Sequence, residues 1–136
     1  MAAPEAAITL DWKHDLVFEG AGRANTPVTV DGDTVVAVSP VEMLLVAAAA
    51  CTGSDVVIIL KKMRVDLTKL EIRLVATRRE TEPRRVTGMS LHVTAQGAGV
   101  DADKVRRAVS LSIEKYCSVI TSLNPDIPVT YDVVVG

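Results

Sequence analysis

Apolar and polar residues alternate with a period of two along most of this chain, which is typical of strands that bury one face. Ile8, Leu10 and Trp12, for example, alternate with Thr9 and Asp11. The same pattern predicts strands around residues 8–13, 28–30, 69–76, 89–95 and 129–135, and the apolar run at 16–18 after a turn predicts a sixth.

A different pattern predicts a long helix between the third and fourth strands. Ser39–Glu42 forms a capping box with proline at the first helical position. The residues from there to Leu60 are nearly all apolar, and Lys61, Lys62 and Arg64 suit the negative end of a helix dipole. About 23 residues would span roughly 35 Å.

Such a length also fits a membrane span, so the two interpretations have to be compared. Glu42 and Asp55 lie within this segment, together with Thr52, Gly53 and Ser54, and charged side chains are costly in lipid. The rest of the chain reads as ordinary alternating strands. We therefore expect a central helix that is buried on most faces, and no membrane segment.

A second helix is predicted between the fifth and sixth strands. Asp101 suits its N-cap, apolar residues follow at helical spacing from Val105 to Leu123, and Asn124-Pro125 ends it. The order βββ-α-ββ-α-β predicts an α+β fold, and 136 residues without repeat or linker predict one domain, residues 1–136.

Composition narrows the possible functions. A net charge of −2 argues against nucleic acid as a partner, because phosphate binding needs a basic surface. The first residues show neither the charged nor the apolar region of a secretory signal, which predicts a cytoplasmic protein. Two cysteines and two histidines at these spacings predict no metal site.

Each predicted helix carries one cysteine, Cys51 in the first and Cys117 in the second. The residues before Cys51 are alanines, which would let another helix approach closely. Helices packed about 8–10 Å apart can bring facing Cα atoms within the roughly 4.4–6.8 Å that a disulfide needs. The spacing therefore allows a reversible bridge, but because buried free cysteines are common, spacing alone favours two inert thiols in the core.

The surroundings of Cys51 leave its reactivity open. Asp55 lies four residues later on the same helical face, where a carboxylate would raise the pKa of the thiol, so we expect it to serve as a hydrogen-bonded helix partner. A thiolate at Cys51 would need a nearby cation to stabilise it. Arg23 in the Gly-rich loop is a candidate, although the sequence alone favours a solvent-exposed charge there. His14 and His92 are expected at the surface, but a histidine near Cys51 would indicate acyl transfer.

The helix segments resemble the OsmC/Ohr family (osmotically inducible protein C and organic hydroperoxide resistance). The first match runs from Ser39-Pro40-Val41-Glu42 through the alanines and Cys51-Thr52 to Asp55-Val56-Val57. The second match covers Arg107-Ala108-Val109 and Glu114-Lys115-Tyr116-Cys117-Ser118, and the strand order also agrees. The resemblance covers nearly the whole chain and is greatest to a stand-alone branch of OsmC-like proteins.

The resemblance implies an intertwined homodimer, with N-terminal strands of about residues 6–31 exchanged across it. It also implies a thiol peroxidase of oxidative-stress defence, in which Cys51 attacks an organic hydroperoxide and Cys117 then closes a disulfide. An external dithiol reduces the bridge, and no cofactor is needed. The family holds its thiolate with an arginine and a glutamate, matched here by Arg23 and Glu42, although that glutamate usually stands where this chain has Val41.

A second hypothesis is a module that senses redox state or binds a small apolar ligand without catalysis. In this interpretation Met43, Met89 and the alanine-rich helix face would line a ligand site at the dimer interface. Cys51 would then keep the ordinary thiol pKa of about 8.5.

Overall fold

A computed structural model describes residues 3–136 and contains the six strands in the predicted order. The elements are β1 (Thr9–His14), β2 (Val17–Ala21), β3 (Val28–Asp31), α1 (Pro40–Lys62), β4 (Asp66–Arg78), β5 (Val86–Ala98), α2 (Ala102–Leu111), η1 (Ser112–Tyr116), η2 (Ile120–Ser122) and β6 (Val129–Val135). The predicted α+β class is confirmed. The chain forms two compact units, one ending at Leu44 and the other covering Leu45–Gly136.

The N-terminal unit is an antiparallel sheet in the order β1-β2-β3. All six residues of β1 are exposed, and Val17 and Asp31 are the buried members of the other two strands. Asp31 closes the loop after β3, because its carboxylate accepts hydrogen bonds from the backbone N–H groups of Asp33, Val35 and Val36 at 2.9–3.0 Å. These bonds lower the pKa of Asp31.

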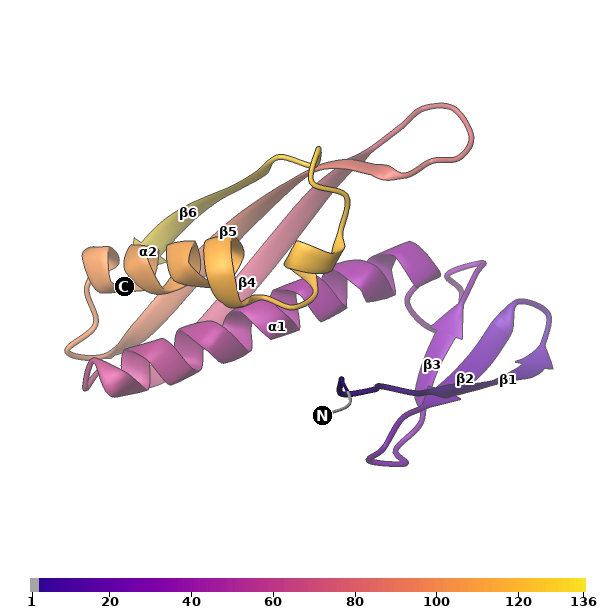
Figure 1. Cartoon of the computed structure of the whole chain (residues 1–136), viewed down its shortest axis with the longest axis horizontal. Coiled ribbons are helices and arrows are strands. Elements are labelled where there is room, and N and C mark those ends of the chain that lie inside the picture. Colours follow the sequence, from indigo (N-terminus) through magenta and orange to yellow (C-terminus); the bar gives the residue numbers. More distant parts are fainter. Residues whose placement is uncertain (1–2) are drawn as a thin grey trace. The chain divides into compact units, whose positions relative to one another are not determined.

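The second unit is a sheet in the order β4-β5-β6, with β4 and β5 antiparallel and β5 and β6 parallel. Figure 1 shows α1 and α2 on the same face of this sheet. Alternate β5 residues, including Leu91 and Val93, point to that face and are buried against Val56 and Leu60 of α1 and Val105 of α2. The period-two pattern of β5 thus builds the core.

Helix α1 begins as the sequence predicts. The Ser39 hydroxyl accepts a hydrogen bond from the Glu42 N–H at 3.1 Å, and Glu42 Oε1 accepts one from the Ser39 N–H at 2.9 Å, which confirms the capping box. The helix has 23 residues, as expected, and ends at Lys62. Arg64 lies beyond the last turn instead of within it, because it adopts a left-handed conformation with φ 61°. Backbone bonds from Arg64 N to Lys61 O and from Val65 N to Leu60 O complete a Schellman cap.

One helix among the described residues, α1, is long and apolar enough to cross a membrane, and 22% of its most apolar stretch is buried. Its buried residues Ala48, Thr52, Val56 and Leu60 follow one another at four-residue spacing and face the core. The prediction of a helix buried on most faces is therefore wrong in extent, because exposed apolar side chains remain on α1, including Val46 and Ile58.

The second helix differs most from its prediction. Helix α2 begins at Ala102 with Asp101 as its N-cap, which accepts a hydrogen bond from the Lys104 N–H at 2.8 Å, but it ends at Leu111 instead of continuing to Leu123. It passes into a π-turn, η1, closed by the bond from Cys117 N to Ser112 O at 2.8 Å. After an extended residue at Cys117, the chain forms a short 3-10 turn, η2.

Candidate functional site

The two cysteines meet inside the second unit. Cys51 lies in α1 and is half-buried, whereas Cys117 is fully buried at the end of η1. Both are free thiols, and the Cys51 thiol lies close enough to Cys117 to raise the pKa of that buried thiol. The predicted approach of the two thiols is therefore present in the structure.

Cys117 is held by its own backbone and by its neighbours. Its sulfur accepts a hydrogen bond from the Ile120 N–H at 3.4 Å, and its carbonyl accepts one from the Thr121 N–H at 3.0 Å and one from the Thr121 hydroxyl at 2.7 Å. Burial raises the pKa of Cys117, and the neighbouring Cys51 thiol adds to the rise. The Ile120 N–H and the Thr52 hydroxyl oppose it, because both favour the thiolate.

Thr52 directly follows Cys51 on α1 and is fully buried. Within residues 3–136 its hydroxyl oxygen has no hydrogen-bond partner, but it lies near enough to the Cys117 thiol to lower the pKa of that thiol. A buried hydroxyl without such a partner is uncommon in proteins. Its position beside the thiol pair places a weak donor where negative charge would develop on Cys117.

A buried hydrogen bond fixes the π-turn to α1. The Ser112 hydroxyl donates to Asp55 Oδ2 at 2.8 Å, and Ser112 is fully buried. Asp55 is therefore a hydrogen-bonded partner between elements, and the expectation that it does not activate Cys51 agrees with this contact. The bond joins the helix turn after Cys51 to the first residue of η1, whose last residue precedes Cys117.

The other two predicted site residues belong to the N-terminal unit. Arg23 is exposed in the turn after β2 and lines a hollow with the segment from Glu5 to Thr9 and with Ala21 and Gly22. Glu42 is exposed at the start of α1, with Oε1 occupied by the Ser39 N–H. Their role around the Cys51 thiolate stays a prediction.

Both histidines are paired with carboxylates. His92 Nδ1 lies 2.7 Å from Asp132 Oδ2 on the exposed face of the sheet, and His14 Nδ1 lies 3.0 Å from Asp15 Oδ2. Because Leu91 and Val93 face the core, His92 points away from the helices. Acyl transfer through a cysteine–histidine pair gains no support from these contacts.

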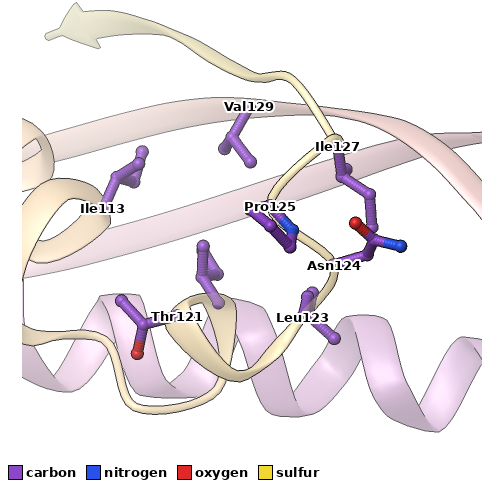
Figure 2. Close-up of a pocket in the computed structure, with 8 residues that line it drawn as sticks. Ile113, Thr121, Leu123, Asn124, Pro125, Ile127 and Val129 are labelled. Carbon is purple, nitrogen blue, oxygen red and sulfur yellow. The ribbon is translucent and has the colours of Figure 1, made fainter.

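Sequence patterns missed two features beside Cys117. One is the π-turn itself, since Ser112–Tyr116 contains neither glycine nor proline. The other is a cavity of about 350 Å³ (Figure 2), lined by Ile113, Ile120, Thr121, Leu123, Asn124, Pro125, Ile127 and Val129. No sequence signal pointed to this cavity, because its lining residues read as helix, loop and strand.

Two features define the class of protein. One is an α+β fold with two helices on one face of a three-stranded sheet, and the other is a free thiol from each helical region. The family model described as OsmC-like protein matches residues 31–132. Protein YhfA of Escherichia coli (strain K12) is 40% identical over 121 residues, covering 88% of this chain and 90% of YhfA. The chain belongs to the OsmC-like family.

Solved structures agree with this fold. A hypothetical protein from Aquifex aeolicus VF5 is 27% identical with a TM-score of 0.85, covering 98% of this chain and 99% of its own. The organic hydroperoxide resistance protein OhrB of Bacillus subtilis is 13% identical with a TM-score of 0.62, covering 98% and 100%. At that identity, the likeness to OhrB concerns the fold alone.

Proposed function

We propose that this protein is a cytoplasmic thiol peroxidase that reduces organic hydroperoxides in oxidative-stress defence. The observation that carries the proposal is the unequal exposure of two adjacent free thiols, Cys51 half-buried and Cys117 fully buried. A peroxide from solvent can reach Cys51 first. The buried Cys117 thiol then lies close enough to Cys51 to form a disulfide with it.

The proposed reaction has two steps on the protein. The Cys51 thiolate attacks one oxygen of the O–O bond, which breaks to give a Cys51 sulfenic acid and, after protonation, the alcohol. The Cys117 sulfur then attacks the sulfenic sulfur, and water leaves as the disulfide forms. An external dithiol returns the pair to two thiols by exchange and is itself oxidised to a disulfide.

Arg23 and Glu42 complete the proposal as stabilisers of the Cys51 thiolate. A guanidinium beside a thiolate lowers the pKa of the thiol, and a carboxylate can orient the guanidinium. In this assignment Glu42 acts in addition to its capping-box contact with Ser39. Loss of the Arg23 charge should therefore slow the first step.

We further propose that the protein works as a homodimer. In β1 and the residue before it, Ile8, Leu10 and Trp12 form an apolar row that is 72%, 54% and 67% exposed. A three-stranded sheet leaves such a row in water unless another surface covers it. Trp12 is the single tryptophan of the chain, so its fluorescence should shift to longer wavelength on dilution below the dimer dissociation constant.

The experiment mixes reduced protein with a slight excess of a bulky organic hydroperoxide, and follows free thiols and intact mass over seconds to minutes. The wild type should lose two thiols and about two mass units, because a disulfide retains neither hydrogen. Cys51→Ser should show no fast reaction. Cys117→Ser should stop at a sulfenic or over-oxidised Cys51, and wild-type turnover by Cys51→Ser would refute the assignment.

The raised pKa of Cys117 predicts how the second step depends on pH. Because the thiolate is the attacking form, the rate of disulfide closure should rise about tenfold per pH unit below that pKa. Stopped-flow mixing at pH 6.5, 7.5 and 8.5 measures this step separately from the first. A closure rate that is flat over this range would show that Cys117 ionises much lower than its burial implies.

A second candidate is a redox-sensing or ligand-binding module without useful peroxidase activity. The observation that favours it is the Glu42 carboxylate, which already has a partner in the Ser39 N–H. Of the two methionines proposed to line the ligand site, Met43 is half-buried and Met89 is 3% exposed in the core. The same experiment separates the candidates, since the module predicts no thiol loss over minutes.

A further inference from the structure

The row of α1 residues that faces the core carries one hydroxyl among aliphatic side chains. Its members Ala48, Thr52, Val56 and Leu60 are all fully buried. In the part of the chain that the structure describes, the Thr52 hydroxyl oxygen has no hydrogen-bond partner. A valine has nearly the same shape and would avoid the cost of burying an unpaired hydroxyl. The hydroxyl therefore destabilises the resting fold, and no contact within that fold explains it.

The Thr52 hydroxyl also forgoes the local bond that a helix offers. Serine and threonine hydroxyls in helices often donate to the backbone carbonyl four residues earlier. Ser54 does so, because its hydroxyl donates to the Ala50 carbonyl at 2.8 Å. The equivalent bond from Thr52 to the Ala48 carbonyl is not formed. The Thr52 hydroxyl is consequently free to bond a group on an element packed against α1.

The segment packed against this part of α1 carries Cys117. Asp55 lies three residues after Thr52 on neighbouring helix surface, and its carboxylate accepts the bond from the Ser112 hydroxyl at 2.8 Å. The Ser112 carbonyl in turn accepts the Cys117 N–H at 2.8 Å. The Thr52 hydroxyl lies near enough to the Cys117 thiol to lower the pKa of that thiol. An unpaired buried hydroxyl thus lies beside a fully buried sulfur.

The protonation state of Cys117 decides whether its sulfur can use this hydroxyl. The sulfur already accepts the Ile120 N–H at 3.4 Å. A neutral thiol is a weak acceptor, so it attracts a second donor only weakly. A thiolate is a charged acceptor, and hydrogen bonds to charged groups are about twice as strong as neutral ones. A hydroxyl that is unpaired beside the thiol can therefore become a bonded donor to the thiolate.

We propose that the Thr52 hydroxyl and the Ile120 N–H form a two-donor site that stabilises the Cys117 thiolate. This role rests on the proposed function, in which Cys117 carries negative charge twice. The thiolate first attacks the sulfenic sulfur of Cys51 and expels hydroxide, which takes up a proton and leaves as water. When an external dithiol later attacks the Cys51 sulfur, the S–S bond breaks and its electron pair stays on Cys117. Burial opposes that charge in both steps, and the two donors offset the effect of burial.

The first test measures the ionisation of Cys117 without peroxide or disulfide. Ultraviolet absorbance of the thiolate is followed against pH in Cys51→Ala protein, and adding Cys117→Ala supplies the tyrosine background. Of the titratable groups near Cys117, Cys51 is thereby removed and Asp55 is common to all variants. Thr52→Val should raise the pKa of Cys117 by about one unit, as expected for loss of a hydrogen bond to a charged group. Thr52→Ser, which keeps the hydroxyl, should leave that pKa near the value of the Cys51→Ala parent.

Urea unfolding of the same variants separates this role from a structural one. Thr52→Val removes an unpaired hydroxyl at nearly constant volume, so its unfolding midpoint should equal or exceed that of the parent. Thr52→Ser deletes a buried methyl group, so its midpoint should fall. Ser54→Ala, at an exposed hydroxyl of the same helix, is the control and should not shift the pKa of Cys117. An unchanged pKa in Thr52→Val, or an equal rise in Thr52→Ser, would overturn the two-donor site.

The second test follows both steps after hydroperoxide is added to protein with both cysteines. At a pH below the pKa of Cys117, Thr52→Val leaves about a tenth of the thiolate, each about threefold more nucleophilic. Disulfide closure should therefore slow about fourfold, and Thr52→Ser should close at nearly the wild-type rate. A loss confined to the first step would place the hydroxyl on Cys51 and overturn the proposal.

The two tests distinguish failure of this site from failure of the proposed function. If the wild type does not react with hydroperoxide while the pKa of Cys117 responds to Thr52→Val, the peroxidase assignment is wrong and the two-donor site stands. If turnover proceeds while that pKa is the same in Thr52→Val and its parent, the two-donor site is wrong and the peroxidase assignment stands.

Discussion

The hydrogen bond between Ser112 and Asp55 offers a direct test of how the π-turn holds Cys117. Ser112→Ala removes a fully buried hydroxyl that donates to a carboxylate at 2.8 Å. Hydrogen bonds to charged groups contribute about 1.5–3 kcal/mol. Because Asp55 is only half-buried and water can partly replace the lost donor, we expect the free energy of unfolding to fall by about 2 kcal/mol.

A matched control lies two residues earlier, near the end of α2. The Ser110 hydroxyl also donates to a carboxylate, Glu114 Oε1, but at 3.3 Å and at the solvent-exposed surface. Ser110→Ala should therefore cost less than about 0.5 kcal/mol. Urea unfolding of both reduced variants at one protein concentration measures the difference directly.

A kinetic measurement distinguishes a role of this bond in positioning Cys117 from a role in the stability of the fold alone. If the bond orients η1, Ser112→Ala should slow closure of the disulfide after peroxide addition while leaving formation of the Cys51 sulfenic acid unchanged. Ser110→Ala should change neither rate. Equal stability losses in the two variants, or unchanged closure in Ser112→Ala, would refute the view that this bond fixes Cys117.

Three further predictions concern stability. Gly97 has φ 150°, and a Cβ there would lie 2.1 Å from the Asp66 carbonyl oxygen, so Gly97→Ala should cost about 3 kcal/mol or more in urea unfolding. An alanine variant as stable as the wild type would contradict that backbone contact. Arg64→Gly should raise the free energy of unfolding by about 1 kcal/mol, because glycine accepts the left-handed conformation without strain, and a loss would contradict this. Asp31→Asn should lower the melting temperature above pH 4, and the difference should disappear as the pH falls through the lowered folded pKa, since the carboxylate stabilises the fold only while ionised. A difference that persists at pH 2 would contradict this linkage.

The elements with a local signal could be predicted from the sequence. Alternation predicts five of the six strands, and an apolar run after a turn predicts the other. The capping residues Ser39 and Asp101 predict the starts of both helices, because capping depends on nearby backbone groups. The position of Arg64 just beyond α1 could not be predicted, since no local sequence pattern marks a residue other than glycine for the left-handed conformation.

The end of α2 could not be predicted for a physical reason. Residues Ser112–Tyr116 suit a regular helix locally, but the Ser112 hydroxyl finds its partner 57 residues away in Asp55. This contact exists only after the helices pack. Helix geometry predicts that Cys51 and Cys117 can approach each other, but it does not predict the extended backbone of Cys117 or its neighbouring cavity.

The burial of Cys117 has a consequence for how electrons would enter an oxidised pair. A reducing thiol must attack one of the two bridged sulfurs, and the half-buried Cys51 is the one that solvent-borne molecules can reach. The mixed disulfide would then form on Cys51, and Cys117 would depart as the leaving group. Because a leaving thiol with a raised pKa departs slowly, the bridge would persist against small thiols and favour a reductant that binds the protein.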